Sequence, residues 1–248
     1  MHSLRPTWAE IDLGAIAHNI KQIRGLLNGS TKFMAILKAN AYGHGMLEVA
    51  RTCVEQGVDY LGVALLDEAL YLRENGITTP MLILGYTPPP ALDAVVEFGF
   101  RQTIFDPKTA ELLSEAAVKQ GRKAFVHIKV DTGMSRTGFF TDEETVKTVA
   151  RVCKLPGLTV EGIYTHLAAA DSADETFTRL QLQRFSGFLQ ALQSSGIRIP
   201  IRHAANSAGI AFYPEAHYDL VRAGINLYGL RSSVERESNL GLIPAMRL

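Results

Sequence analysis

The sequence alternates between short runs rich in β-branched and aromatic residues and longer stretches whose apolar residues recur every three or four positions. This order predicts parallel strands joined by helical crossovers. We expect strands at residues 33–37, 60–64, 81–84, 101–105, 124–130, 158–166, 201–205 and 220–226. Eight strands are the number that closes a (β/α)8 barrel, or TIM barrel, and this α/β architecture is the predicted fold.

The helical stretches lie between these strands. They are expected at residues 46–56, 109–120, 143–153 and 175–194, with an earlier helix at 13–27 that Asp12 would cap. Gly57, Gly121 and Gly196 stand just after three of them, where glycine takes a left-handed conformation without steric cost. An open doubly wound sheet shows the same alternation, but no GxGxxG motif follows the first strand. The barrel is therefore favoured.

The bulk composition is that of an ordinary globular protein. Of 248 residues, 47% are hydrophobic, which is enough for one large core. The 25 basic residues balance the 25 acidic ones, so we expect neither a nucleic acid nor a membrane as partner. The start, MHSLRPTWAEIDL, lacks the apolar run of a signal peptide, and a cytoplasmic location is expected. Cys53 and Cys153 are expected to be reduced core residues, and no metal site is expected.

The first expected strand ends in a lysine. Lys38 follows an apolar run and leads into a loop that contains Tyr42 and His44. In a barrel, functional groups project from the carboxyl ends of the strands. Partial burial there favours the neutral amine, the form that attacks a carbonyl group to make an imine. Taken alone, Lys38 is explained more simply as a lysine that extends its ammonium group to solvent.

The fifth expected strand has a polar face. His127, Lys129 and Asp131 alternate with apolar residues and so share one side of the strand. Polar groups inside a barrel need partners. Asp131 and Arg136 could supply them, or a covalent modification could change the charge of Lys129. Alternatively, these side chains lie at the rim and pair with one another.

Polar and small residues also follow the last three expected strands. They are His166, Asn206, Ser207, Arg222, Gly224 and Ile225. Barrels often bind phosphate in the loops after strands seven and eight, where backbone N–H groups are available to an anion. Each residue singly has an ordinary structural explanation, such as a helix cap. Together with Lys38 they are the equipment of an enzyme that uses pyridoxal 5′-phosphate (PLP).

Six motifs resemble those of the alanine racemase family, in the family's order and spacing. They are WAEIDL, AILKANAYGHG, HIKVDTGMSRTGF, YTHLAAAD, HAANSA and VRAGINLYG, and they extend over essentially the whole chain. The resemblance implies the barrel of fold-type III PLP enzymes, with PLP as the cofactor. It also implies an isomerase that interconverts L-alanine and D-alanine for peptidoglycan precursors.

The resemblance implies roles for individual residues as well. Lys38 would bind the cofactor as an imine and act as the base on the D-alanine side. The cofactor phosphate would be bound by Tyr42, Ser207, Gly224 and Ile225, with Asn206 in the same loop. Arg222, held by His166, would face the pyridine nitrogen, and Arg136 would approach the ring hydroxyl and the substrate. In the family the lysine that matches Lys129 is often carbamylated, which would make it an anion that orients Arg136.

An arginine beside the pyridine nitrogen has a chemical consequence. A carboxylate there would keep the nitrogen protonated and make the cofactor a strong electron sink, whereas the guanidinium of Arg222 cannot accept that proton. The negative charge at Cα is then less delocalised. Reprotonation at Cα is favoured over transamination.

The family continues beyond the barrel into a C-terminal β domain, which carries a tyrosine that acts as the second base from the partner subunit. This chain stops at Leu248. We therefore expect residues 1–230 to be the barrel, residues 231–248 to be a linker and the start of a truncated domain, and the isolated chain to be a poor racemase. A homodimer is expected for the full-length family protein.

Two other functions stay open. The first is a single-domain PLP-binding protein of cofactor homeostasis, which would lack the DTGMSRTGF segment found here. The second is a barrel that serves only as an interaction domain, in which Lys38 would be dispensable. The preference for alanine over serine rests on the resemblance alone.

Overall fold

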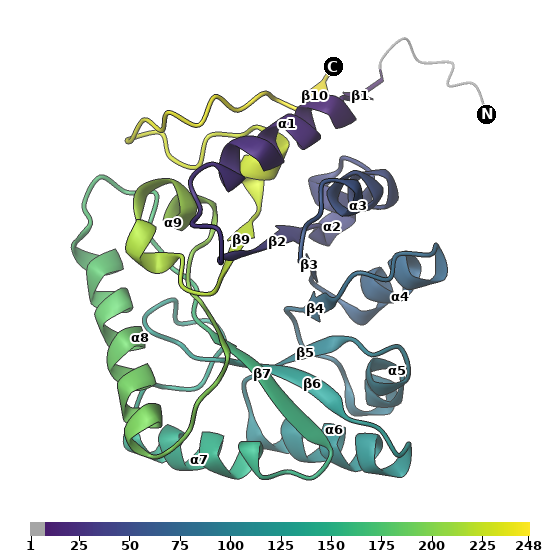
Figure 1. Cartoon of the computed structure of the whole chain (residues 1–248), viewed down its shortest axis with the longest axis vertical. Coiled ribbons are helices and arrows are strands. Elements are labelled where there is room, and N and C mark those ends of the chain that lie inside the picture. The colour runs from purple at the N-terminus through teal and green to yellow at the C-terminus, as the bar shows by residue number, and fades with distance from the viewer. Residues whose placement is uncertain (1–7) are drawn as a thin grey trace.

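The computed structural model describes residues 8–248, and its centre is a barrel of parallel strands (Figure 1). The strands are β2 (Lys32–Ile36), β3 (Tyr60–Val63), β4 (Met81–Ile83), β5 (Arg101–Ile104), β6 (Ala124–Lys129), β7 (Leu158–Tyr164), β8 (Ile201–His203) and β9 (Leu220–Ala223). They are hydrogen-bonded in the order β8-β7-β6-β5-β4-β3-β2-β9. Backbone hydrogen bonds of 3.0 Å from Asp219 N–H to the Arg202 carbonyl and from Arg222 N–H to the Ala205 carbonyl join β9 to β8. This closure confirms the predicted barrel over the open sheet.

All eight predicted strands are present, and each ends one to three residues earlier than predicted. The residues beyond these ends, such as Lys38 and His166, turn out of the ladder into loops at the mouth of the barrel. Their side chains are therefore available to a site at that mouth instead of being fixed in the barrel wall.

Helices surround the barrel. The predicted ones are α1 (Leu13–Arg24), α3 (Met46–Glu55), α6 (Pro107–Lys119), α7 (Glu143–Cys153) and α8 (Thr176–Ser194), and α4 (Leu66–Glu74) and α5 (Leu92–Glu97) complete the crossovers. Shorter elements are α2 (Lys38–Tyr42), α9 (Ser207–Phe212) and the 3-10 turns η1 (Pro89–Ala91), η2 (Pro214–Ala216) and η3 (Ile225–Tyr228). The φ angles of Gly57, Gly121 and Gly196 are +70°, +63° and +77°, which confirms their predicted left-handed conformation. Among the helices of residues 8–248, none combines the length and hydropathy needed to cross a bilayer.

Helix α1 takes the place in the outer ring that a helix after β9 would occupy, since the short 3-10 turn η3 follows that strand in place of a longer helix and α1 packs against it. Asp12 caps it as predicted, because its Oδ1 accepts a hydrogen bond of 2.9 Å from Ala15 N–H. The buried amide of Asn19 donates to the carbonyls of Leu227 (3.1 Å) and Ile243 (2.8 Å). Beside α1, the short strands β1 (Glu10–Ile11) and β10 (Met246–Arg247) pair in antiparallel fashion (Figure 1).

The cysteine prediction is half right. Cys53 is buried and reduced, but Cys153 is exposed at the end of α7. The buried side of α7 is made by residues such as Val149 and Val152, and Cys153 lies one position past it. Residues 1–7, on which much of the expectation about a signal peptide rests, lie outside the described residues.

Candidate active site

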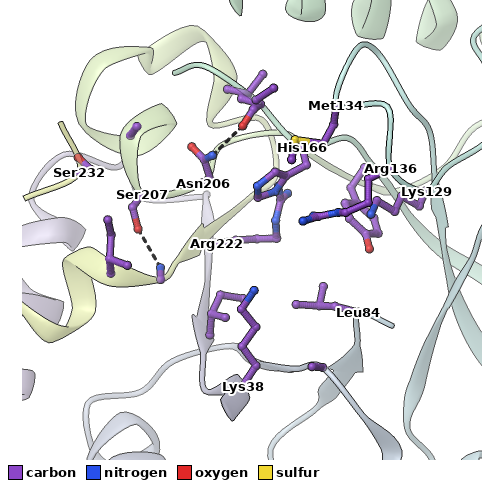
Figure 2. A pocket seen from close by; sticks show the side chains of 18 of the residues that line it. Lys38, Leu84, Lys129, Met134, Arg136, His166, Asn206, Ser207, Arg222 and Ser232 are labelled. Carbon is purple, nitrogen blue, oxygen red and sulfur yellow. Dashed lines mark hydrogen bonds between the residues drawn. The ribbon is translucent and has the colours of Figure 1, made fainter. Parts of the chain in front are cut away.

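A cavity of about 540 Å³ opens at the carboxyl end of the barrel (Figure 2). It is lined by all ten residues that the sequence analysis assigned to the site, which are Lys38, Tyr42, Lys129, Arg136, His166, Asn206, Ser207, Arg222, Gly224 and Ile225. They come from the ends of β2, β6, β7, β8 and β9 and from the loops that follow, which is where barrels build their sites. The structure therefore brings the predicted residues together.

Lys38 is presented by an unusual turn. Ala39, Asn40, Ala41 and Tyr42 all have φ between +53° and +54°, so α2 is a left-handed turn of residues without glycine. Such a conformation costs L-residues about 1–2 kcal/mol each, and the surroundings must hold it. The carboxylate of Glu68 accepts a hydrogen bond of 2.7 Å from Ala39 N–H, and Asn40 Oδ1 accepts one of 2.8 Å from Met46 N–H.

The turn directs two side chains into the cavity. Lys38 extends its amine into the cavity, toward Arg222 (Figure 2). The same Nζ lies 5.8 Å from the centre of the Tyr42 ring. The amine and the Tyr42 hydroxyl thus face one cavity from a single short segment.

Ser207, Gly224 and Tyr42 form a small polar cradle. Ser207 Oγ accepts hydrogen bonds from Gly224 N–H at 3.0 Å and from Asn226 N–H at 3.4 Å, so the hydroxyl hydrogen of Ser207 is left to donate elsewhere. A Cβ atom on Gly224 would lie 3.3 Å from Tyr42 Oη and 3.5 Å from Ser207 Oγ. Glycine at this position therefore keeps open a space that two hydroxyls face. Asn206 caps α9, since its Oδ1 accepts from Gly209 N–H at 3.0 Å.

Lys129 is buried in the barrel interior, which is the first of the two alternatives considered for the polar face of its strand. Its Nζ donates to Thr137 Oγ1 at 2.5 Å and lies 5.8 Å from the centre of the Tyr164 ring. Burial and the nearby charges of Arg136 and Arg222 lower the pKa of Lys129 to about 8. A substantial fraction of the neutral amine is thus present near physiological pH.

Asp131 was one of the partners considered for this polar face. Its carboxylate accepts hydrogen bonds from the backbone N–H groups of Gly133, Ser135 and Arg136 and so holds the loop after β6. Burial raises the pKa of Asp131, but these hydrogen bonds outweigh burial and the pKa is lowered. The role of Asp131 in the structure is to shape the loop that carries Arg136.

Arg222 lies at the centre of the cavity floor and is 4% exposed. Its Nη2 donates to the carbonyls of Thr165 (2.8 Å) and Ala204 (3.0 Å), and its Nη1 donates to His203 Nδ1 (3.0 Å). Burial lowers the pKa of Arg222 to about 10, so it stays a cation. The imidazole that accepts from Arg222 is therefore His203, a contact that the resemblance assigned to His166.

His166 lies against the cations of the cavity (Figure 2). Its pKa is lowered to about 3 by burial first, and then by the positive charges of Arg222, Arg136, Lys129 and Lys38. The lining contains these four basic side chains and one acidic one, Asp171. Such an imbalance favours anionic ligands.

Sequence reasoning missed several lining residues and supports of the site. They are Leu84, Met134, Thr137, Tyr164, Ser232 and, behind the cavity wall, Glu161 and His203. Only Glu161 and His203 carried a readable signal, since each is an ionisable residue inside or at the end of an apolar strand. The apolar and hydroxyl residues did not stand out, because such side chains are common throughout the interior of a barrel.

The fold and the cavity together define a PLP-type barrel, with an amine beside a hydroxyl-lined anion cradle. A family model for the N-terminal domain of alanine racemase matches residues 11–232. The chain belongs to the alanine racemase family, whose cofactor is PLP.

Individual relatives agree with this assignment. The chain is 47% identical to an alanine racemase of Methanococcus maripaludis, over 98% of this chain and 65% of the relative, and 50% identical to one of Desulfovibrio desulfuricans, over 98% and 66%. An alanine racemase of Clostridium difficile in complex with cycloserine superposes with a TM-score of 0.96 at 39% identity, over 99% of this chain and 68% of that one. An alanine racemase of Bacillus anthracis with bound L-Ala-P has a TM-score of 0.93 at 34% identity, over 99% and 64%. The chain thus spans about two thirds of the length of the relatives it matches.

Proposed function

We propose that this chain is the cofactor-binding barrel of a PLP-dependent alanine racemase. The observation that carries the proposal is the cavity in which Lys38 and the cradle of Tyr42, Ser207 and Gly224 face a common space. When bound, PLP supplies an electron-accepting ring that makes the Cα proton of an amino acid acidic. The residues of the chain bind and orient the reactants and move the proton.

The phosphate end of the site is supported by the cradle. The Ser207 hydroxyl is oriented by Gly224 N–H and so has a hydrogen to donate to a phosphate oxygen, and Tyr42 Oη offers a second donor. Ile225 begins η3 beside them and Asn206 caps α9, so both belong to the same rim. A Cβ at position 224 would narrow the space, which fits a site that needs room for an anion.

Lys38 is proposed as the residue that holds the cofactor covalently and as one of the two proton-transfer groups. Its amine is the primary amine directed into the cavity from β2 (Figure 2). It would take the proton from Cα of D-alanine in one direction of the reaction and, in the other direction, deliver a proton to that same face to make D-alanine. Racemisation also needs a group on the opposite face, which we propose comes from a part of the full-length protein beyond these 248 residues.

Arg222, His166 and Arg136 are proposed to orient the cofactor ring and the substrate. Arg222 is the buried cation at the cavity floor and would face the pyridine nitrogen without giving it a proton. His166 beside it is neutral, because its pKa is about 3. Arg136 reaches the cavity from the loop after β6 and would bind the ring hydroxyl and the substrate carboxylate.

Absorbance spectroscopy tests the proposal. PLP added to the protein should give a visible absorption band that persists after gel filtration, and borohydride should fix the adduct on the peptide that contains Lys38. The band should be absent from Lys38→Ala. Lys32→Ala removes an exposed lysine from the other end of β2 and should keep the band. Equal labelling of both variants would refute the assignment of Lys38.

The alternative of a cofactor-homeostasis protein is not favoured, because the curated relatives are alanine racemases and the DTGMSRTGF segment supplies Arg136 to the cavity. For the full-length protein we further propose alanine as substrate, a homodimer, a cytoplasmic location and a role in peptidoglycan precursor supply. Residues 231–248 would then link the barrel to a β domain. Sedimentation and racemisation assays on the full-length protein with alanine and serine test these points.

A further inference from the structure

A line of buried side chains crosses the barrel interior and ends on Arg222. Arg222 Nη1 lies 3.0 Å from His203 Nδ1, and His203 Nε2 lies 2.9 Å from His127 Nδ1. His127 Nε2 lies 3.1 Å from Glu161 Oε2. Arg101, the first residue of β5, binds the same carboxylate from Nε (3.1 Å) and Nη2 (3.2 Å). Both imidazoles are 0% exposed, so water does not compete for these bonds.

Arg222 can only donate hydrogen bonds and the carboxylate of Glu161 can only accept them, so the hydrogen bonds between these two ends all run in one direction. A guanidinium can only donate, so His203 Nδ1 must be the unprotonated acceptor and His203 Nε2 must carry the hydrogen. His203 then donates to His127 Nδ1, which leaves the hydrogen of His127 on Nε2. That hydrogen is donated to Glu161, whose carboxylate can only accept. Starting from Arg222 or from Glu161 leads to the same pair of Nε2–H tautomers.

Neighbouring residues hold the rings of His203 and His127 in the orientations that these hydrogen bonds require. The Tyr164 ring stacks on His203 with centres 4.7 Å apart and planes at 16°. His127 lies directly on Gly162, where a Cβ atom would be 2.3 Å from His127 Nδ1. The register between β6 and β7 shifts at Val126/His127, so Glu161 is the extra residue of a β-bulge. A bulge changes the direction in which a side chain points, and here the Glu161 side chain points toward the barrel interior.

The charge states agree with this assignment. Burial lowers the pKa of His127 and lowers that of His203 well below its ordinary value, so both rings stay neutral. Burial raises the pKa of Glu161, but hydrogen bonds from His127 and Arg101 outweigh burial and bring it to about 2. Glu161 is therefore a carboxylate under the neutral rings.

We propose that Glu161 and His127 are positioning residues for Arg222: the carboxylate fixes both imidazoles as Nε2–H tautomers, so that His203 accepts from Arg222 and holds its guanidinium in the PLP site. Neither Glu161 nor His127 belongs to the cavity lining. The part of the inference that concerns the cofactor rests on the proposed function. The part that concerns the tautomers does not.

Glu161→Lys combined with Arg101→Glu is the informative variant, because the new amine can only donate and the new carboxylate keeps its charge paired. Glu161→Gln would not serve, because Oε2 accepts from both Arg101 Nε and His127 Nε2 and an amide oxygen at that position keeps both bonds. In the double variant the amine would face His127 Nε2. His127 would have to accept there and carry its hydrogen on Nδ1, and His203 would follow. Two donors would then face each other between His203 Nδ1 and Arg222 Nη1.

The test combines nitrogen-15 NMR of the imidazoles in the cofactor-free protein with PLP titrations. We expect Nε2–H signals for His127 and His203 in the parent chain and Nδ1–H signals in the double variant Arg101→Glu/Glu161→Lys. PLP affinity should fall about tenfold or more in that variant, as expected when a buried hydrogen bond becomes a conflict, and the absorption maximum of bound PLP should shift. Thr87→Val is the matched control, since it removes a buried side-chain hydrogen bond of 2.7 Å to Gln102 elsewhere in the barrel. It should leave PLP affinity and both tautomers unchanged.

Other results decide against the proposal. An unchanged His203 tautomer and unchanged PLP affinity in the double variant would overturn it, as would an Nδ1–H signal for His203 in the parent chain. If the double variant does not fold, His127→Phe interrupts the line with an aromatic ring, and the same loss of affinity is required. If the parent chain does not bind PLP, the proposed function fails, and the tautomers of the cofactor-free protein still decide whether the line has the stated direction.

Discussion

Glu68, in the first turn of α4, accepts a hydrogen bond from the backbone N–H of Ala39 at 2.7 Å, one residue after Lys38. The second oxygen of the same carboxylate accepts from Ala64 N–H at 2.6 Å, at the end of β3. One side chain thus ties the left-handed turn after β2 to the neighbouring strand. We expect the direction of the Lys38 amine to depend on this tie.

Removal of the tie should disturb Lys38 without touching the cavity. Glu68→Ala removes the acceptor of the exposed Ala39 N–H and of the partly buried Ala64 N–H, and a lost hydrogen bond of this kind costs about 0.5–1.5 kcal/mol. We expect the turn to relax and the covalent attachment of PLP to slow, which stopped-flow absorbance measures. Asp67→Ala removes a neighbouring charge from the same helix turn and is the control. Equal attachment rates in the two variants would argue against a role for Glu68.

Gly224→Ala should weaken PLP binding by filling the cradle. The new Cβ would stand 3.3 Å from Tyr42 Oη and 3.5 Å from Ser207 Oγ, where the phosphate is proposed to lie. We expect a Kd for PLP that is about tenfold or more higher, and little change in the weaker binding of pyridoxal, which has no phosphate. Gly187→Ala places a methyl group on α8 with no atom within 4 Å and should bind PLP normally. An equal loss for PLP and pyridoxal would contradict the assigned phosphate position.

Lys129 should react with carbon dioxide. Burial and neighbouring cations lower its pKa to about 8, so the neutral amine is available. The amine nitrogen bonds to the carbon of CO2 and releases one proton, and the resulting carbamate anion would be stabilised by Arg136. With carbon-13 bicarbonate we expect a carbamate NMR signal that is absent from Lys129→Ala and present in Lys123→Ala. A signal of equal strength in both variants would assign it elsewhere.

The cofactor-free protein should lose stability as the pH falls below about 6.5. His127, His166 and His203 have lowered pKa values because of burial, so unfolding takes up a proton at each of them between about pH 6.5 and the lower folded values. The free energy of unfolding then falls with decreasing pH, by up to about 1.4 kcal/mol per pH unit for each proton. Urea unfolding from pH 7 to pH 5 measures the slope. His127→Phe should reduce it, and a flat profile would contradict the prediction.

A protein that consists of residues 1–248 alone should exchange protons on one face of Cα only. Lys38 is the proposed base for D-alanine, so deuterium from solvent should enter D-alanine faster than L-alanine. Racemisation should be about 10²–10⁴-fold slower than in the full-length protein, which is the usual contribution of one general acid–base group. Proton NMR in D2O follows both reactions. Full racemase turnover by residues 1–248 would refute the need for a second base outside the barrel.

The barrel and the lining of the site could be predicted because they depend on local patterns. Strand and helix periods set the order of elements, and polar residues such as Lys38 and His166 stand out at the ends of apolar strands. Parallel strands then bring these ends to one mouth. The ten residues meet in the cavity for that reason.

Two features could not be predicted in this way. The left-handed turn from Ala39 to Tyr42 has no glycine, and its support from Glu68 comes from a different crossover. The bulge at Glu161 shifts the register by one residue, and strict alternation has no sign of such an insertion. The resemblance assigned the partner of Arg222 to His166. The strand pattern could not correct this, because it does not tell which of two histidines, His166 or His203, reaches a guanidinium from another strand.

The position of α1 has a consequence for synthesis. The Asn19 amide bonds to carbonyls that lie 208 and 224 residues further along the chain, at Leu227 and Ile243. At about 5–20 residues per second, roughly 10 to 45 seconds separate the emergence of α1 from that of its docking site. The side of α1 that packs against η3 has no partner during that time, so α1, although made before the barrel strands, completes its packing only after the last of them.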